Sequence, residues 1–179
     1  MGAQYRRVGK LAPVARSDWF RAFLFLHALG AISALGPTLT YGMWVSRAEQ
    51  GGPGTRAFAL RTISWIDRRL ATPAYVLQAA TGTALILLTE RDFWGTAWLL
   101  LGVALYIAMV VFAVGLYAPT FRRQRTLAEE LVDRPGDSDL EVRYLRAAGT
   151  ARTYGLTAAV LTVLIVLLMV VKPALWSAG

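Results

Sequence analysis

The sequence contains no cysteine, and it has a single histidine, His27, among its 179 residues. Without cysteine the chain can form no disulfide framework, no thiolate metal site and no redox-active dithiol. One histidine without cysteine also cannot supply the usual three or four protein ligands of a zinc site. We therefore expect no metal site built from the side chains of this chain.

Catalytic sequence motifs are missing as well. The chain has no Walker loop, no glycine fingerprint for dinucleotides, no HExxH and no serine in a GxSxG context. Acidic residues are few within the apolar stretches, so no pathway of carboxylates for ion transport is visible. We therefore expect no catalytic residue in this chain.

The sequence is rich instead in long apolar runs. Hydrophobic residues make up 56% of the chain and charged residues 17%, whereas soluble domains average roughly 45–50% and about 25%. The runs lie at about 19–45, 73–89, 93–117 and 154–171, and each is long enough for a transmembrane helix. They predict an all-α membrane protein with a basic N-terminal arm (residues 1–18) and a single domain (residues 19–173), folded as an antiparallel bundle of four transmembrane helices.

We expect the bundle to be organised around the first run. As a helix, this run would be about 40 Å long, which is more than the roughly 30 Å hydrocarbon core of a bilayer. Pro37 removes a backbone donor and crowds the preceding turn, so it predicts a bend in this helix. Thr38 and Thr40 can offer hydroxyls to the backbone near the bend.

The first two connections differ in length. Residues 46–72 predict either a short amphipathic helix in the membrane interface or a loop segment packed on the bundle. Only Glu90-Arg91-Asp92 separates the second apolar run from the third. Because this turn is so short, we expect the second and third helices to be antiparallel neighbours.

The third connection is predicted to be largely helical. The third helix should continue to about Val132, and residues 134–137 are typical of a turn. Ser138 and Glu141 match a capping box, with Ser138 as the N-cap of the next helix. These features predict a helical hairpin between transmembrane helices three and four that extends into the cytoplasm.

The formal net charge of +8 lies mostly beside the apolar runs. Arginines in such places predict contact with anionic lipid headgroups, and not with nucleic acid. Lys and Arg number five in the arm up to Arg21, one in the second connection and one in the tail, but five and seven in the first and third connections. By the positive-inside rule, the two longer connections are cytoplasmic and both termini lie outside.

Three polar residues, His27, Gln78 and Tyr106, are expected to meet inside the bundle. At about 1.5 Å of rise per residue, His27 lies about 12 Å from the outer end of its helix. Gln78 and Tyr106 lie roughly 16–18 Å from the turn that joins the second and third helices. An ionisable residue inside a membrane indicates a functional site, whereas a neutral imidazole can also join two helices by a hydrogen bond. If the site binds a cofactor, haem b fits, with His27 as ligand alone, with a methionine, or from two copies.

Short motifs give the chain a resemblance to known families. The motifs, spread over about residues 20–173, are Leu26–Ala31 with Gly36-Pro37, Trp98-Leu99, Leu105-Tyr106, Ala118-Pro119 and Val171-Lys172-Pro173. They resemble an uncharacterised family of bacterial four-span integral membrane proteins, known only as a domain of unknown function. This likeness implies a multi-pass protein of the bacterial inner membrane.

A more distant likeness depends on the Leu-His-x-x-Gly pattern of residues 26–30. This pattern is similar to one in the copper-resistance D-type membrane proteins and in the histidine-containing type of protoporphyrinogen oxidase. It implies copper or haem handling by histidines in the spans. The chain lacks the further histidines of those families and their tryptophan-glycine-glycine continuation.

Two main hypotheses for function remain. The first is a non-catalytic accessory or assembly subunit of a membrane complex, whose partners are other membrane protein subunits or further copies of the chain. The second is a haem-binding redox or porphyrin-handling membrane protein with His27 as the axial ligand. A third, a small-solute transporter, would need a polar cavity at the level of His27.

Overall fold

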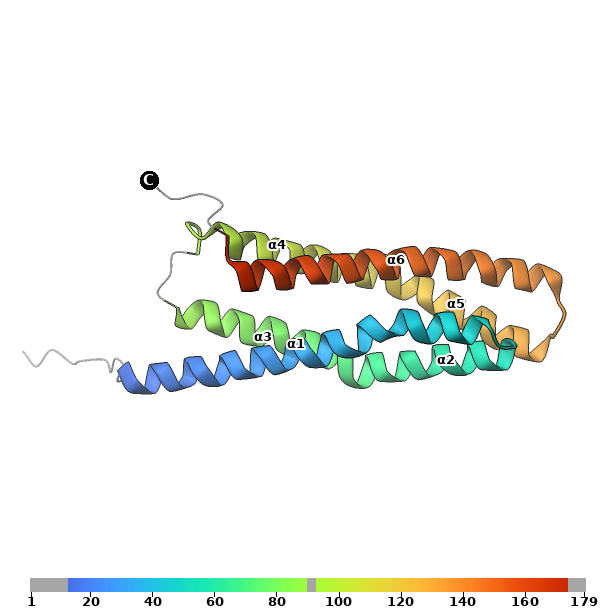
Figure 1. Ribbon diagram of the computed structural model, residues 1–179, viewed down its shortest axis with the longest axis horizontal. Coiled ribbons are helices and arrows are strands. Elements are labelled where there is room, and N and C mark those ends of the chain that lie inside the picture. Colours follow the sequence, from blue (N-terminus) through green and yellow to red (C-terminus); the bar gives the residue numbers. More distant parts are fainter. Residues whose placement is uncertain (1–12, 90–92, 174–179) are drawn as a thin grey trace, which may run out of the picture.

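The computed structural model describes residues 13–89 and 93–173, and every regular element in this part of the chain is helical (Figure 1). Four helices are long and apolar enough to cross a membrane, judged by length and composition: Asp18–Glu49, Pro53–Leu88, Ala97–Asp133 and Ser138–Val171. The prediction of an all-α protein with four transmembrane helices is therefore confirmed. In order, the elements are α1 (Pro13–Glu49), α2 (Pro53–Ile66), η1 (Asp67–Ala71), α3 (Thr72–Leu88), α4 (Ala97–Phe112), η2 (Ala113–Tyr117), α5 (Ala118–Asp133) and α6 (Ser138–Val171).

Two short π-helical segments, η1 and η2, join successive α-helices into single long rods. Each segment ends two residues before a proline, Pro73 or Pro119. Proline has no backbone N–H and its ring crowds the preceding turn. A wider π turn moves the hydrogen-bond register by one residue, so the helix continues past the proline.

Helix α1 extends beyond the predicted run of residues 19–45 at both ends, and Pro37 lies inside it. The hydroxyl of Thr38 donates to the carbonyls of Ala34 and Leu35 at 2.9 and 3.1 Å. That of Thr40 donates to the Pro37 carbonyl at 2.7 Å. The expectation that both threonines bond to the backbone around the proline is confirmed.

The distribution of charged residues divides the molecule into two halves that follow each other along its long axis. Stretches without Asp, Glu, Lys or Arg cover residues 22–46, 70–89, 93–121 and 153–171. The shortest would span about 29 Å as a helix, close to the roughly 30 Å hydrocarbon core. We call these stretches the apolar half. On α1 the apolar half includes only residues 22–41, and residues 42–46 are counted with the polar half. The polar half comprises residues 42–66 and 122–152, whose charged side chains are too costly to place in lipid.

In the apolar half the helices form two separate pairs. Helix α1 packs on α3, and α4 packs on α6. Among the described residues, α3 and α4 have no pair of Cα atoms within 8 Å, and Figure 1 shows them in opposite layers. The prediction that these two helices are neighbours is wrong. Helix α4 begins at Ala97 and not at residue 93, so the connection is long enough to cross from one pair to the other.

In the polar half, four helical segments enclose a hydrophobic core. Helix α2 lies along the bundle beside α5 and the end of α1, and α5 packs on α6 (Figure 1). Each fully buried leucine here stabilises the fold by about 1.5–3 kcal/mol relative to an exposed one. The core consists of Ala57, Leu60, Leu127, Ala128, Leu131, Leu140, Tyr144 and Ala147.

The position of α2 decides between the two interpretations of residues 46–72. An interfacial helix is wrong, because α2 runs along the bundle and buries Ala59 and Ile63. Packing on the bundle is confirmed, although the packed segment is a helix and not a loop. Figure 1 also confirms the helical hairpin of α5 and α6, and the structure adds α2 and the end of α1 to it.

The hairpin turn differs from its prediction in one detail. Asp137, and not Ser138, is the N-cap of α6, and its Oδ1 accepts a hydrogen bond of 3.0 Å from the Leu140 N–H. Gly136 precedes it with a φ of 87°, which a glycine adopts without steric cost. The left-handed glycine places the cap one residue earlier than the Ser138–Glu141 pattern indicates.

Candidate functional site

His27 joins α1 to α3 in the apolar half. Its Nδ1 lies 2.9 Å from the hydroxyl of Thr81. That hydroxyl already donates to the Leu77 carbonyl at 2.6 Å, so it must accept from His27. From this network we assign the imidazole proton to Nδ1, which leaves the lone pair on Nε2.

Two glycines allow the close approach of α1 and α3 at this level. A Cβ on Gly82 would lie 3.2 Å from His27 Cε1, which is tighter than an ordinary contact. A Cβ on Gly30 would lie 3.4 Å from Oε1 of Gln78. That Oε1 is buried and has no hydrogen-bond partner among the described residues. The structure thus brings His27 and Gln78 to one interface between helices.

Tyr106, the third predicted member of the polar centre, makes a different contact. Its hydroxyl donates to the backbone carbonyl of Tyr75 at 2.7 Å, which connects α4 to α3. In the described part of the chain, no hydrogen bond joins Tyr106 to His27. The described residues also contain no group of three or more His, Cys, Asp or Glu side chains that could hold a metal ion.

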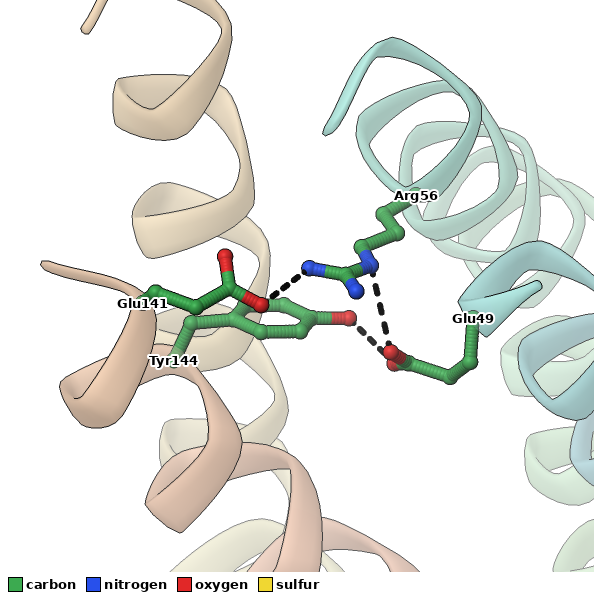
Figure 2. Close-up of polar contacts among 4 residues, drawn as sticks. All are labelled: Glu49, Arg56, Glu141 and Tyr144. Atoms are coloured by element: carbon green, nitrogen blue, oxygen red, sulfur yellow. Dashed lines mark hydrogen bonds and ion pairs between the residues drawn. The ribbon is translucent and has the colours of Figure 1, made fainter. Parts of the chain in front are cut away.

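The sequence analysis missed a polar cluster in the polar half, formed by Glu49, Arg56, Glu141 and Tyr144 (Figure 2). Nη1 of Arg56 donates to Oε1 of Glu141 at 2.7 Å. Nε of Arg56 lies 3.2 Å from Oε2 of Glu49. The phenol of Tyr144 donates to Oε1 of Glu49, and the guanidinium lies over its ring, 5.1 Å from the centroid. We call these four residues the Arg56 cluster.

The Arg56 cluster places one cation between two carboxylates, partly away from water. Burial tends to lower the pKa of Arg56, but its hydrogen bond to Glu141 and the charges of both carboxylates outweigh this and raise the pKa overall. Burial, with the hydrogen bond to Glu49, raises the pKa of Tyr144 above its ordinary value. At neutral pH the cluster therefore contains a charged guanidinium and an intact phenol.

This arrangement suits a structural clamp better than a reaction centre. Glu49 ends α1, Arg56 lies in the first turn of α2, and the other two residues lie in the first two turns of α6. The cluster thus ties the turn between α1 and α2 to the start of α6. The pair Arg56–Glu141 spans 85 positions, and the pair Glu49–Tyr144 spans 95. No local sequence pattern indicates such pairs.

Two further buried polar groups lie outside the predicted site. Tyr41 and Gln124 are almost completely buried. The Tyr41 hydroxyl and the Gln124 Nε2 have no hydrogen-bond partner among the described residues. Each is a single polar group, and neither forms part of a cluster of described residues that could bind a ligand. The Arg56 cluster and the His27 interface therefore remain the candidate functional features.

These features define an all-α integral membrane protein in which a packed polar half adjoins two loosely associated pairs of apolar helices. The chain belongs to the family described as Predicted integral membrane protein (DUF2269), which matches residues 22–173. A comparison with curated proteins and another with solved structures found no match. The resemblance to a four-span family of unknown function is thereby confirmed, whereas the more distant likeness to copper and porphyrin proteins stays a prediction.

Proposed function

We propose that this protein is a non-catalytic accessory or assembly subunit, whose apolar half is completed by helices of other membrane proteins or of further copies of the chain. The observation that supports the proposal best is the low burial of the four spans. In their apolar windows, 11%, 17%, 11% and 0% of the residues are buried inside the protein. The polar half, in contrast, has a core of its own.

The separation of the two helix pairs adds to this argument. Helices associate in membranes by close packing and by hydrogen bonds, because lipid supplies no hydrophobic drive between them. Apart from the hydrogen bond of Tyr106 to the Tyr75 carbonyl, the described residues of α3 and α4 do not approach closely, so each pair keeps an apolar face that further transmembrane helices can cover. The polar half then holds the two pairs at a defined spacing.

Photo-crosslinking in native membranes tests the proposal. The chain has no cysteine, so a single introduced cysteine can carry a unique benzophenone label. Suitable positions are Ile32, Val76, Val114 and Val170, which are all exposed in the apolar half. Val142→Cys, exposed in the polar half, is the matched control.

We expect at least one apolar position to crosslink to a polypeptide, either a second copy or another membrane protein, and Val142 to crosslink much less. If all four positions give only lipid adducts, and the purified particle has the mass of one chain, the assembly role is wrong.

We further propose that the chain resides in the inner membrane with its polar half in the cytoplasm. The excess of Lys and Arg in the first and third connections supports this orientation. A cysteine at exposed Ser138 should react with an impermeant maleimide in inverted vesicles and not in intact cells. The opposite pattern would reverse the orientation.

Haem binding is a second candidate, because the Nδ1–H tautomer leaves Nε2 of His27 as a potential axial ligand. Tyr106 does not join His27 in such a site, because its hydroxyl bonds to the backbone carbonyl of Tyr75. A visible spectrum of the purified protein decides the matter. A Soret band that is lost in His27→Ala would support haem b binding, whereas no band, or one that His27→Ala leaves unchanged, would end it.

A further inference from the structure

A shallow groove runs between α2 and α5 on the surface of the polar half. It encloses about 550 Å³, and a smaller hollow of about 190 Å³ continues it along the same two helices. The aromatic rings of Phe58 and Trp65 lie at its edge, and both are unusually exposed, at 61% and 60%. The charged lining residues are Arg61, Arg68, Arg125 and Glu129.

The charges in this groove are unbalanced, since three arginines face Glu129, and the adjoining hollow adds one further carboxylate, Asp133. Arg125 forms an ion pair with Glu129, with 3.8 Å between Nε and Oε1, which is too long for a hydrogen bond, and this Nε is buried, so an anion must use the terminal nitrogens of Arg125. Arg68 donates only to the backbone carbonyl of Ser64. Arg61 makes no hydrogen bond or ion pair within the described part of the chain. Their guanidinium groups therefore keep free donors that an anion can use.

The groove also lies at the right depth for a lipid headgroup. The charge-free stretch of α3 begins directly after Arg69, and that of α4 and η2 ends directly before Arg122. Arg68 and Arg125 are therefore within about 5 Å of the hydrocarbon boundary, in the headgroup region. Trp65 lies one turn further out, where tryptophan is enriched in membrane proteins.

We propose that the groove between α2 and α5 binds the headgroup phosphate of an anionic phospholipid of the adjoining leaflet. Arg61, Arg68 and Arg125 hold the phosphate oxygens, and the exposed ring of Trp65 packs against the headgroup. Arginine is suited to this task because its planar fork matches phosphate geometry. The proposal is independent of the assembly role, since it needs no protein partner.

Native mass spectrometry of the full-length protein in detergent tests the site, with phosphatidylglycerol and phosphatidylcholine as probes. The wild-type protein should bind phosphatidylglycerol at least about tenfold more tightly, because the choline cation of phosphatidylcholine offsets its phosphate charge and is repelled by the three arginines. The combined variant Arg61→Gln, Arg68→Gln, Arg125→Gln should lose this preference. A control variant with Arg47→Gln, Arg143→Gln and Arg146→Gln loses the same charge elsewhere on the polar half and should keep it.

Arg61→Gln alone guards against misfolding of the triple variant, because its side chain is exposed. It should weaken phosphatidylglycerol binding roughly three- to tenfold. Equal affinity for both lipids, or an equal loss in the control variant, would overturn the proposal. Displacement of the lipid by inorganic phosphate would indicate a soluble anion as ligand, and displacement by a polyglutamate peptide an acidic protein partner. Either result would overturn the lipid assignment.

Discussion

Arg56 in the first turn of α2 and Glu141 in the first turn of α6 share a hydrogen-bonded ion pair of 2.7 Å. One turn further along α6, Tyr144 donates to Glu49 at the end of α1. Three helices thus meet in four side chains (Figure 2). Because the polar half holds the two apolar pairs together, the stability of this cluster bears on the whole molecule.

Arg56→Gln should lower the free energy of unfolding by about 1–3 kcal/mol, because it leaves two carboxylates without their cation in a partly buried site. The side chain of Arg56 is only 15% exposed, so water screens the loss weakly. Thermal unfolding in detergent, followed by circular dichroism, should show a fall of several degrees in Tm. Arg134→Gln is the control, since Arg134 pairs on the surface with 58% of its side chain exposed and such pairs contribute less than about 1 kcal/mol. Equal shifts in both variants would contradict the importance of the cluster.

The phenol of Tyr144 should make stability depend on pH in the alkaline range. Burial and the contact with Glu49 raise its pKa above the ordinary value of 10.0, so the folded state holds this proton more tightly than the unfolded state does. The resulting stability is complete below pH 10 and is lost as the pH rises from there toward the folded-state pKa. Unfolding midpoints measured between pH 8 and about 11 should fall less in Tyr144→Phe than in the wild type. Parallel curves would show that the phenol does not contribute.

Gly82→Val should separate α1 from α3. The added Cβ alone would lie 3.2 Å from the His27 ring, and overpacking of this kind costs about 1–3 kcal/mol. Gly42→Val on α1 is the matched control, because no atom beyond the adjacent residues and backbone of α1 itself lies within 4 Å of the Cβ position there. A lower Tm for the Gly82 variant only is the expected result. If the two variants unfold alike, the close approach at Gly82 is not required.

The hydrogen bond between Thr81 and His27 should set the tautomer of the imidazole. In the wild type, nitrogen-15 shifts of His27 should show the proton on Nδ1. Thr81→Val removes the acceptor and should shift the ring toward the other tautomer, with a stability loss of about 0.6 kcal/mol, typical of such bonds in membranes. Thr83→Val, whose hydroxyl bonds only to the Ala79 carbonyl, should leave the shifts unchanged. An Nε2–H tautomer in the wild type would disprove the assignment.

Several features of this protein follow from local sequence. Long charge-free runs predict transmembrane helices because each apolar residue adds independently to the free energy of insertion. The turn before α6 was likewise predictable, since Gly136 and Asp137 determine their own backbone. The sequence pattern indicates Ser138 as the N-cap, one residue later than the true cap, because Ser138 and Asp137 are both good caps. Only the hydrogen bond to Leu140 distinguishes them.

The arrangement of the helices could not be derived in this way. Almost every face of α4 and of the second half of α6 is apolar, so hydropathy does not indicate which face meets another helix. A few specific contacts decide the pairing, such as His27 with Thr81 between α1 and α3, and Thr162 with Met109 between α6 and α4. The expected meeting of Tyr106 with His27 therefore rested on depth alone, and depth does not determine direction.

The sequence by itself determined four spans, their approximate limits and the hairpin beyond the third, because these depend on the composition and backbone preferences of neighbouring residues. Only the tertiary structure decided that α3 and α4 lie apart, that α2 joins the polar half, that Arg56 meets Glu141 and that Tyr144 meets Glu49. These contacts join residues distant in the chain. Their free energy depends on geometry that exists only once the helices are packed.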